Sequence, residues 1–255
     1  FGAPQVEFAV ERQMDRIARA LGLDPYEIRD RNVVGPGDRL PTGQVLDGST
    51  AARLCLEEAE ARTGFRARWR EHEAARALAI SAPHDGAPLP GIGLALYFHG
   101  SGFTGNGERR MQSPVTVRLA DDGRVEVLTA MTEMGQGSAV VLPQIAAAAG
   151  GLQDDDLVFA APDTGQVPDS GPTVASRTTM IVGGAIAKAV AELTGKIATW
   201  WSSREGRADA PGAPFRETAR AYLAEVGPLT VTVRHEPPAG QFDEARYQGD
   251  AYPVY

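Results

Sequence analysis

The sequence contains a single cysteine, Cys55. One cysteine cannot form an internal disulfide, and it excludes zinc or iron–sulfur sites built from several cysteines of this chain. This cysteine usage favours a reducing, cytoplasmic setting. On a helix, Ala52, Cys55, Leu56 and Ala59 would share one face. We therefore predict that Cys55 is a small buried core residue, with a nucleophilic role as the alternative.

Positive charge and long apolar runs are also scarce. The chain has 25 Lys and Arg residues against 33 Asp and Glu residues, which gives a formal net charge of -8. Because the basic residues are scattered and form no stripe, nucleic acid is not an expected partner. The longest apolar runs, such as Ala139 to Ala149, are too short to span a bilayer, so no membrane partner is expected either.

An initiator methionine and a secretory signal are missing, since the chain begins at Phe1. We interpret the chain as a fragment or a processed piece of a longer protein. Its 255 residues are enough for one large domain, or for one domain plus part of another.

Metal-ligand spacing is absent as well. His72, His84 and His235 stand apart from other candidate ligands, and His99 is predicted to be a structural histidine at the end of a strand. The run Asp154 to Asp156 is interpreted as a solvated turn, because no further carboxylates recur at the spacing of a calcium loop. The sequence therefore predicts no side chain that binds a metal directly.

The N-terminal part is predicted to be helical. Gln5 to Asn32 is interrupted by a stop at Gly22 and restarts after Asp24-Pro25, where Pro suits the first turn of a second short helix. The apolar stripe of the first helix consists of Phe8, Met14, Ile17, Ala18 and Leu21.

A linker is predicted from Val33 to Leu46, which is rich in Gly and Pro, and a long helix from about Ser49 to Arg76 begins the next unit. We place the domain boundary near Gly43 to Asp47. Residues 1–46 would then be the end of a first domain with its linker, and residues 47–255 a second domain.

The second domain alternates strand and helix patterns. The segment Ala77 to Pro90 is predicted to be a loop and Gly91 to His99 a buried strand. Asp121-Asp122-Gly123 is a turn signal between two alternating strands. The predicted elements after Asn106 are strands at Val115 to Leu119, Val125 to Leu128, Leu157 to Ala161 and Leu229 to Arg234, and helices at Ser138 to Ala149, Met180 to Ser202 and Phe215 to Val226. This order indicates an α+β domain.

Two glycine- or hydroxyl-rich loops open directly into apolar helices. The first is Met131 to Ser138 and the second is Pro168 to Thr179. The N-terminus of a helix presents backbone N–H groups to an anion or a polar ligand, so two such junctions in one domain indicate a shared ligand. A nucleotide-binding enzyme would use them too, but the chain lacks a P-loop lysine and a strand followed by Gly-x-Gly-x-x-Gly.

Five motifs, in this order, resemble the molybdopterin-binding subunit of the xanthine dehydrogenase/aldehyde oxidase family. They are Phe1-Gly-Ala-Pro-Gln5, Pro41-Thr-Gly-Gln44, Gly102-Phe-Thr-Gly105, Thr132-Glu-Met-Gly-Gln-Gly137 and Pro172-Thr-Val-Ala-Ser176. The resemblance covers essentially the whole chain but only an interior section of that subunit. It implies the second molybdopterin-binding domain of the family for residues 47–255, truncated at its C-terminus.

The resemblance also implies a cofactor site. In the family these loops hold molybdopterin and its phosphate near molybdenum, with the pterin in some members carried as a dinucleotide. Glycines would let the backbone approach closely, and hydroxyl and N–H groups would donate to the cofactor, while Arg177 could add positive charge. The implied cofactor-binding residues are Gly135, Gln136, Gly137, Thr173, Ala175, Ser176 and Thr178.

On the substrate side, Phe1 and Phe103 resemble the aromatic pair that sandwiches a flat heterocycle, and Thr104 would be an adjacent polar contact. Glu108 follows closely enough for a substrate contact to be an alternative, although a role away from the substrate is favoured. The family's catalytic base is a glutamate in a Gly-Glu-Gly segment, and this chain has no such segment. The resemblance therefore implies no catalytic residue within this chain and no turnover by the chain alone.

Three functions are compatible with these patterns. The first is a section of a molybdenum hydroxylase that oxidises a heteroaromatic, purine-like compound or an aldehyde. By resemblance, it would work with the remaining segments of the molybdenum subunit and with partner domains or subunits that carry iron–sulfur clusters and FAD. The second is a cofactor-free fragment or interaction module of the same fold. The third is a phosphate- or nucleotide-binding enzyme.

Overall fold

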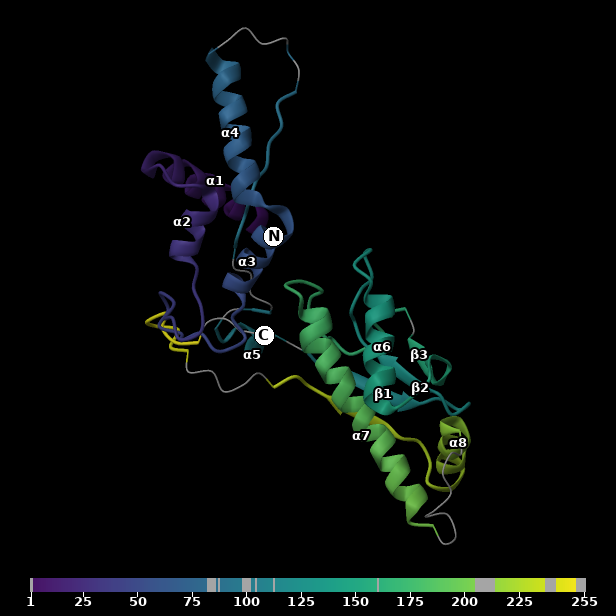
Figure 1. The fold of residues 1–255 in the computed structure, drawn as a ribbon. Helices are drawn as coiled ribbons and strands as arrows, with labels where there is room; N and C mark the ends of the chain where they lie inside the picture. Colours follow the sequence, from purple (N-terminus) through teal and green to yellow (C-terminus); the bar gives the residue numbers. More distant parts are fainter. Residues whose placement is uncertain are drawn as a thin grey trace. The chain divides into compact units, whose positions relative to one another are not determined.

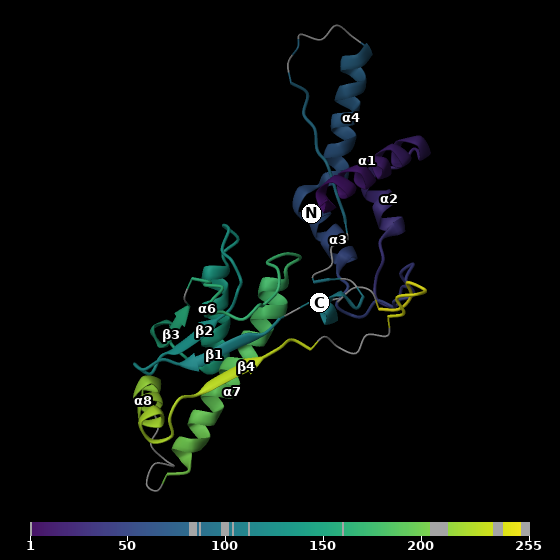
Figure 2. The same ribbon diagram turned by 180° about the vertical axis from the view of Figure 1, so that it is seen from behind.

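The computed structural model describes residues 2–81, 86, 88–97, 102–103, 105–111, 113–159, 161–204, 214–236 and 242–250. The chain divides into two compact units, Phe1–His99 and Gly100–Pro253 (Figures 1 and 2). The domain boundary near Gly43 to Asp47 stays a prediction. Among the described residues, no helix is both long and apolar enough to cross a membrane.

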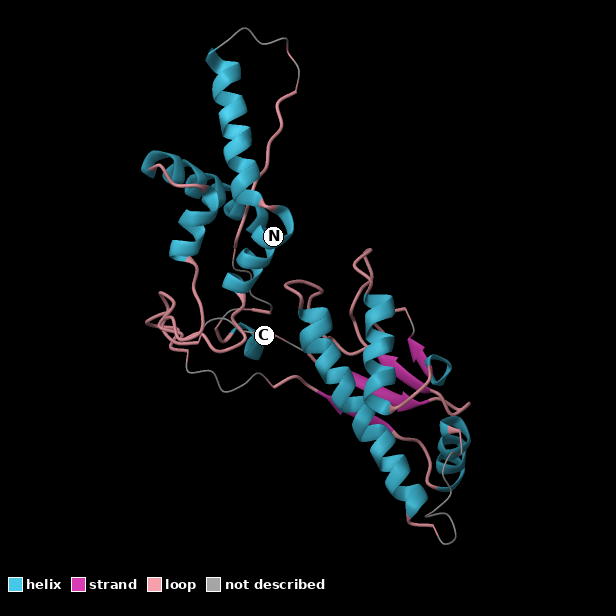
Figure 3. Cartoon of the chain, viewed as in Figure 1, coloured by secondary structure: helices cyan, strands magenta, loops and turns pink. Residues whose placement is uncertain are grey.

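The first unit is helical in its described part (Figure 3), with α1 (Ala3–Leu21), α2 (Pro25–Asn32), α3 (Ala52–Thr63) and α4 (Phe65–Ser81). The predicted stop and restart are confirmed. Gly22 ends α1 with a φ of 69°, in the left-handed region that favours glycine. The Asp24 carboxylate then caps α2 by accepting from the Glu27 N–H at 2.8 Å.

Several details of the first unit differ from the predictions. The single helix expected from Ser49 to Arg76 is two helices, because Gly64 adopts a φ of 59° and ends α3. Cys55 is exposed, and the prediction of a buried core residue is wrong. Its neighbour Leu56 is only 1% exposed and is the one residue of α3 that is buried in the described structure. A short helix that buries one narrow face leaves the next position, about 100° around the axis, in solvent.

The apolar stripe of α1 is buried only in part, since Ala18 is fully buried whereas Phe8 and Leu21 are 69% and 63% exposed. The segment from Val33 to Leu46 is more ordered than a linker. Its Leu46 side chain is buried, and Leu46 donates its N–H to the Asp38 carbonyl at 2.9 Å.

No strand forms in the described part of the predicted strand Gly91 to His99, which is residues 91–97. The Leu96 N–H donates to the Glu11 carboxylate at 2.9 Å, so a side chain takes the place of a neighbouring strand. His99 itself lies outside the described residues, as does His84.

A four-stranded sheet forms the centre of the second unit. The strands are β1 (Val115–Leu119), β2 (Val125–Leu128), β3 (Leu157–Phe159) and β4 (Thr230–Val233), in the order β3-β2-β1-β4. The hairpin of β1 and β2 is confirmed, with Val117 opposite Val127. β4 is antiparallel to β1, and β3 is parallel to β2. Gly123 makes the tight turn with a φ of 82°.

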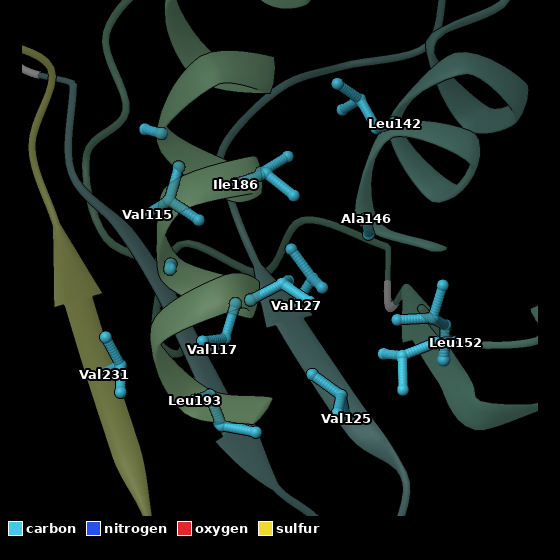
Figure 4. Packing of buried hydrophobic residues seen from close by; sticks show 14 of the residues in the cluster. Val115, Val117, Val125, Val127, Leu142, Ala146, Leu152, Ile186, Leu193 and Val231 are labelled. Carbon is cyan, nitrogen blue, oxygen red and sulfur yellow. The ribbon is translucent and has the colours of Figure 1, made fainter. Parts of the chain in front are cut away.

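Two helices cover one face of this sheet, α6 (Ser138–Gly150) and α7 (Gly183–Ser202) (Figures 1 and 4). Val117 and Val127 point from the sheet toward Ile186 and Leu193 of α7, and all four are essentially inaccessible. Burying each such side chain stabilises the fold by about 1.5–3 kcal/mol. With α8 (Phe215–Glu225) packed against this core through Ala219, the unit has the α+β fold that the sequence predicts.

Close approach of α6 and α7 depends on glycine. A Cβ at Gly150 would lie 2.7 Å from Val190 Cγ1, and one at Gly183 would lie 2.8 Å from Ile145 Cδ1. The two helices therefore hold their N-terminal ends, and the loops that lead into them, in a fixed relation.

Candidate functional site

The first loop, Met131 to Ser138, connects β2 to α6. Gly135 and Gly137 have φ values of 104° and 88°, which L side chains rarely adopt. A Cβ added at either glycine would meet no atom within 4 Å, so the space above both is open. The backbone here is accessible to a ligand that approaches closely.

Glu133 accepts hydrogen bonds from two backbone donors of this loop and from one in the first turn of α6. Its carboxylate accepts from the N–H groups of Gly135 (2.6 Å), Gly137 (3.1 Å) and Ala139 (2.9 Å), and from the Ser138 hydroxyl at 3.1 Å. These bonds, that of the Ala139 N–H foremost, lower the pKa of Glu133 to about 2. The sequence interpretation, in which this helix N-terminus offers its N–H groups to a ligand, is therefore wrong for these three donors.

Gln136 lies between the two glycines. Its side-chain amide turns toward its own loop, donating to the Thr132 carbonyl (2.8 Å) and the Ser138 hydroxyl (3.3 Å) while accepting from the Met134 N–H (2.7 Å). Its backbone N–H, in contrast, has no acceptor among the described residues. The Gln136 N–H thus stays available beside the open space over the glycines.

The second loop lies directly beside the first. The Thr173 hydroxyl accepts from the Thr132 N–H at 3.1 Å and from the Thr132 hydroxyl at 3.2 Å. Below this contact, the fully buried Ser170 accepts from the Ala130 N–H at 3.1 Å and donates to the Pro114 carbonyl at 2.9 Å. The structure therefore brings together the two loops that the sequence singles out.

Ala175 and Ser176 have φ values of 52° and 59°. Two consecutive non-glycine residues in the left-handed region cost about 1–2 kcal/mol each, and such strain is typically held at functional sites. The Ser176 side chain is exposed. Thr178 begins a short π-helix, η2 (Thr178–Val182), which runs into α7, and its hydroxyl faces inward at 3.4 Å from Met131 Sδ. Short π-helical turns are also frequent at functional sites.

Arg177 is fully buried and does not face the open side of the loop. Its Nε donates to both carboxylate oxygens of Glu108 at 3.0 Å, and its Nη1 donates to the carbonyls of Ser170 (3.3 Å) and Pro172 (3.0 Å). Glu108 is 6% exposed and lies in α5 (Gly107–Arg110). The interpretation of Glu108 as a substrate contact and of Arg177 as a free positive charge therefore fails, because the two neutralise each other inside the protein.

Phe103 is half-buried in the described part of the substrate-side loop. Its N–H donates to Glu108 Oε1 at 2.9 Å, and its Cβ lies against Gly107, where an added Cβ would come within 2.5 Å. The other two predicted substrate residues, Phe1 and Thr104, lie outside the described residues. Within the described part of the chain, no group of His, Cys, Asp and Glu side chains has the arrangement of a metal site.

Comparison with known proteins identifies the family. Residues 62–255 match a family model described as a molybdopterin cofactor-binding domain, and residues 1–33 match a second model of the same description. A xanthine dehydrogenase molybdenum-binding subunit of Escherichia coli O157:H7 is 34% identical over 205 residues, which cover 77% of this chain and 25% of that protein.

Solved structures agree with this assignment. Aldehyde oxidoreductase from Desulfovibrio gigas superposes with a TM-score of 0.75 at 26% identity, over 99% of this chain and 25% of that one. Quinoline 2-oxidoreductase from Pseudomonas putida 86 has a TM-score of 0.67 at 27% identity, over 91% of this chain and 32% of that one. The chain spans about a quarter of the length of the relatives it matches. It belongs to the xanthine dehydrogenase/aldehyde oxidase family, among the molybdopterin-binding subunits.

Proposed function

We propose that the chain is part of a molybdenum hydroxylase and that its two joined loops bind the molybdopterin cofactor. The observation that carries this proposal is the pairing of the loops through Thr132 and Thr173, with open space above Gly135 and Gly137. When bound, the molybdenum centre supplies the transfer of a water-derived oxygen to carbon. The described residues of this chain bind and orient it.

The donors are divided between the loops. Gly135, Gln136 and Gly137 offer an accessible backbone with one N–H that has no acceptor in the described structure. The second loop offers the exposed Ser176 with the backbone of Ala175 and Thr178, while Thr173 joins the loops. Because Glu133 already places a negative charge at the N-terminus of α6, a phosphate is repelled there. The cofactor phosphate, or a dinucleotide extension, therefore belongs at the second loop.

The substrate of the assembled enzyme is a heteroaromatic compound or an aldehyde. The relatives above are a xanthine dehydrogenase, an aldehyde oxidoreductase and a quinoline oxidoreductase, so both classes occur among them. An aromatic ring at Phe103 favours a flat substrate. This leans toward purine-like rings.

Activity requires partners. No Gly-Glu-Gly segment occurs in this sequence, so the glutamate base must come from another segment of the molybdenum subunit. Iron–sulfur clusters and FAD are expected on partner domains or subunits, in the reducing, cytoplasmic setting that a single cysteine favours. The alternative is a cofactor-free fragment or interaction module with this fold, which would be inactive in any assembly.

Molybdenum content distinguishes the two proposals. Elemental analysis and intact-mass spectrometry would be applied to the enzyme assembled with its partners, in the wild type and in Gly137→Ala. In the variant a Cβ projects into the open space over the loop, so we expect molybdenum content to fall. The matched control is Gly151→Ala at the other end of α6, because Gly151 also has a positive φ (63°) and open surroundings.

Near-stoichiometric molybdenum in the wild type and in the Gly151→Ala control, with loss in Gly137→Ala, supports the proposal. Equal molybdenum in both variants contradicts close approach of the cofactor to this loop. No molybdenum in the wild-type assembly supports the cofactor-free alternative.

A further inference from the structure

One buried carboxylate connects the substrate-side loop to the cofactor-side loop. Glu108 Oε1 accepts both from Arg177 Nε at 3.0 Å and from the Phe103 N–H at 2.9 Å. Arg177 in turn holds the carbonyls of Ser170 and Pro172 on the second loop. The ion pair therefore links two backbone segments. Glu108 binds the Phe103 N–H, and Arg177 binds the carbonyl of Pro172, the residue before Thr173.

A backbone hydrogen bond runs beside this ion pair. The Gly102 N–H donates to the Ala175 carbonyl at 2.6 Å, and Ala175 is the first of the two residues with left-handed backbone. The residue before Phe103 is thus bound to the strained part of the cofactor-side loop. A shift of Ala175 and Ser176 is therefore transmitted to Phe103 both by this backbone hydrogen bond and by the ion pair.

The segment that follows Phe103 is closely packed. Its Cβ lies against Gly107, and the next turn of the loop is covered by the ring of Phe242, which would come within 2.7 Å of a Cβ at Gly105. The Asn106 side chain also donates to the Phe242 carbonyl at 3.2 Å. These contacts order the loop after Gly105, while the ion pair binds the Phe103 backbone itself.

Stability alone does not account for a buried ion pair at this place. Desolvation of two charges roughly cancels their attraction, and apolar pairs of similar volume often replace such pairs without loss of stability. What an ion pair with several hydrogen bonds does provide is one defined geometry. Arg177 and Glu108 are 69 residues apart in the sequence, and their ion pair fixes the position of the Phe103 loop relative to the loop before Arg177.

We propose that Glu108 and Arg177 are positioning residues that fix Phe103 relative to the loop of Thr173 to Ser176. This rests on the proposed function, in which that loop binds the cofactor and Phe103 contacts the substrate. Neither residue touches the reacting atoms. The ion pair instead sets where a flat substrate stacks once the cofactor is seated on its loop.

Hydrogen–deuterium exchange of the assembled enzyme tests the connection directly. Exchange would be followed in the peptides covering residues 102–111 and 172–178, in the cofactor-free and the molybdenum-loaded protein. In the wild type, loading slows exchange in both peptides. In Glu108→Gln, which lacks the charge for Arg177 but leaves the bond between Gly102 and Ala175 in place, loading still slows exchange in 172–178 but slows it less in 102–111 than in the wild type.

The matched control is Glu244→Gln. Glu244 pairs with Arg110 of the same helix α5, but both side chains are exposed. The control should respond to loading as the wild type does. If Glu108→Gln does not fold, Arg177→Lys serves instead, because it keeps the buried charge but loses the fixed fork of donors.

A second readout is selectivity between benzaldehyde and propanal, which share a reacting group but differ in the flat ring. If Glu108→Gln loses the stacking geometry, the ratio of kcat/KM for benzaldehyde to kcat/KM for propanal should fall roughly three- to tenfold, the range expected for one aromatic contact. The fall should come from a higher KM for benzaldehyde. The propanal kcat should change little.

The two proposals fail in different ways. If loading leaves 172–178 unchanged in the wild type, the proposed cofactor loop is refuted. If 172–178 responds but 102–111 responds equally in the wild type and in Glu108→Gln, with an unchanged aldehyde ratio, the positioning role is refuted and the proposed function stands.

Discussion

The energetic cost of breaking the buried pair of Arg177 and Glu108 can be predicted with a double-mutant cycle. Arg177→Met leaves the Glu108 carboxylate 6% exposed and without this cation, although the Phe103 N–H still donates to it. Removing one partner of a buried ion pair costs about 3–5 kcal/mol, because the remaining charge stays desolvated. Glu108→Gln should cost a similar amount, because it removes the carboxylate that balances the buried guanidinium of Arg177.

The double variant should lose much less unfolding free energy than the sum of the losses in the two single variants. The introduced methionine and glutamine carry no charge, and the amide oxygen of that glutamine can still accept from the Phe103 N–H. Replacing a buried pair by uncharged groups of similar volume is often neutral. We therefore expect the double variant to lie within about 2 kcal/mol of the wild type, and the coupling free energy to be at least about 4 kcal/mol.

Urea unfolding followed by tryptophan fluorescence measures this cycle. Trp200 and Trp201 lie on α7 in the same unit as the ion pair, whereas Trp69 lies on α4 in the other unit. A Trp69→Phe background therefore restricts the signal to the unit that contains the mutations. Single variants whose costs add within about 0.5 kcal/mol would refute the reasoning, because additivity is the behaviour of groups that do not interact.

Two further predictions concern single residues. The pKa of Glu133 is lowered to about 2, so its contribution to loop order is fully present above about pH 4.5 and is lost as the pH falls toward 2. Hydrogen exchange in residues 131–139, measured as a function of pH, should therefore quicken toward pH 2 in the wild type and vary less with pH in Glu133→Gln. The same pH profile in both proteins would contradict the capping role of the Glu133 carboxylate. Gly123→Ala adds a Cβ 2.7 Å from the Arg216 carbonyl at a φ of 82°, and should destabilise the second unit by about 1–3 kcal/mol in thermal melts. Gly195→Ala, in the exposed part of α7 with open surroundings, is its control and should not destabilise.

Elements with local signals could be predicted from the sequence. The turn at Asp121 to Gly123, the helix restart at Asp24-Pro25 and the start of α6 at Ser138 all follow from a few neighbouring residues. Some predictions that depend on contacts between distant segments failed. The segment of residues 91–97 has the apolar sequence of a buried strand but forms none, because its Leu96 N–H donates to a glutamate of α1 instead of to a neighbouring strand.

The same distinction separates the parts of the candidate site. Both loop–helix junctions could be predicted, because glycines and hydroxyl residues before an apolar run are a local pattern. That the Glu133 carboxylate binds the donors of its own loop was missed, although an acidic residue just before a helix is a recognised signal for capping. The ion pair of Glu108 and Arg177 has no local signal, since its members are 69 residues apart and are unremarkable charges in their own segments.

The two loops of this family site are held in place in different ways. The first loop is ordered from within, by a carboxylate and an amide that satisfy their own backbone. The second loop is ordered by contacts with other residues. Thr132 of the first loop donates to Thr173, and the buried Arg177 side chain donates to the Pro172 carbonyl. Because left-handed backbone at Ala175 and Ser176 persists only where surrounding contacts enforce it, removal of the buried pair should relax the second loop before the first. The backbone strain at Ala175 and Ser176 is therefore maintained by Thr132 and Arg177, neither of which is proposed to bind the ligand.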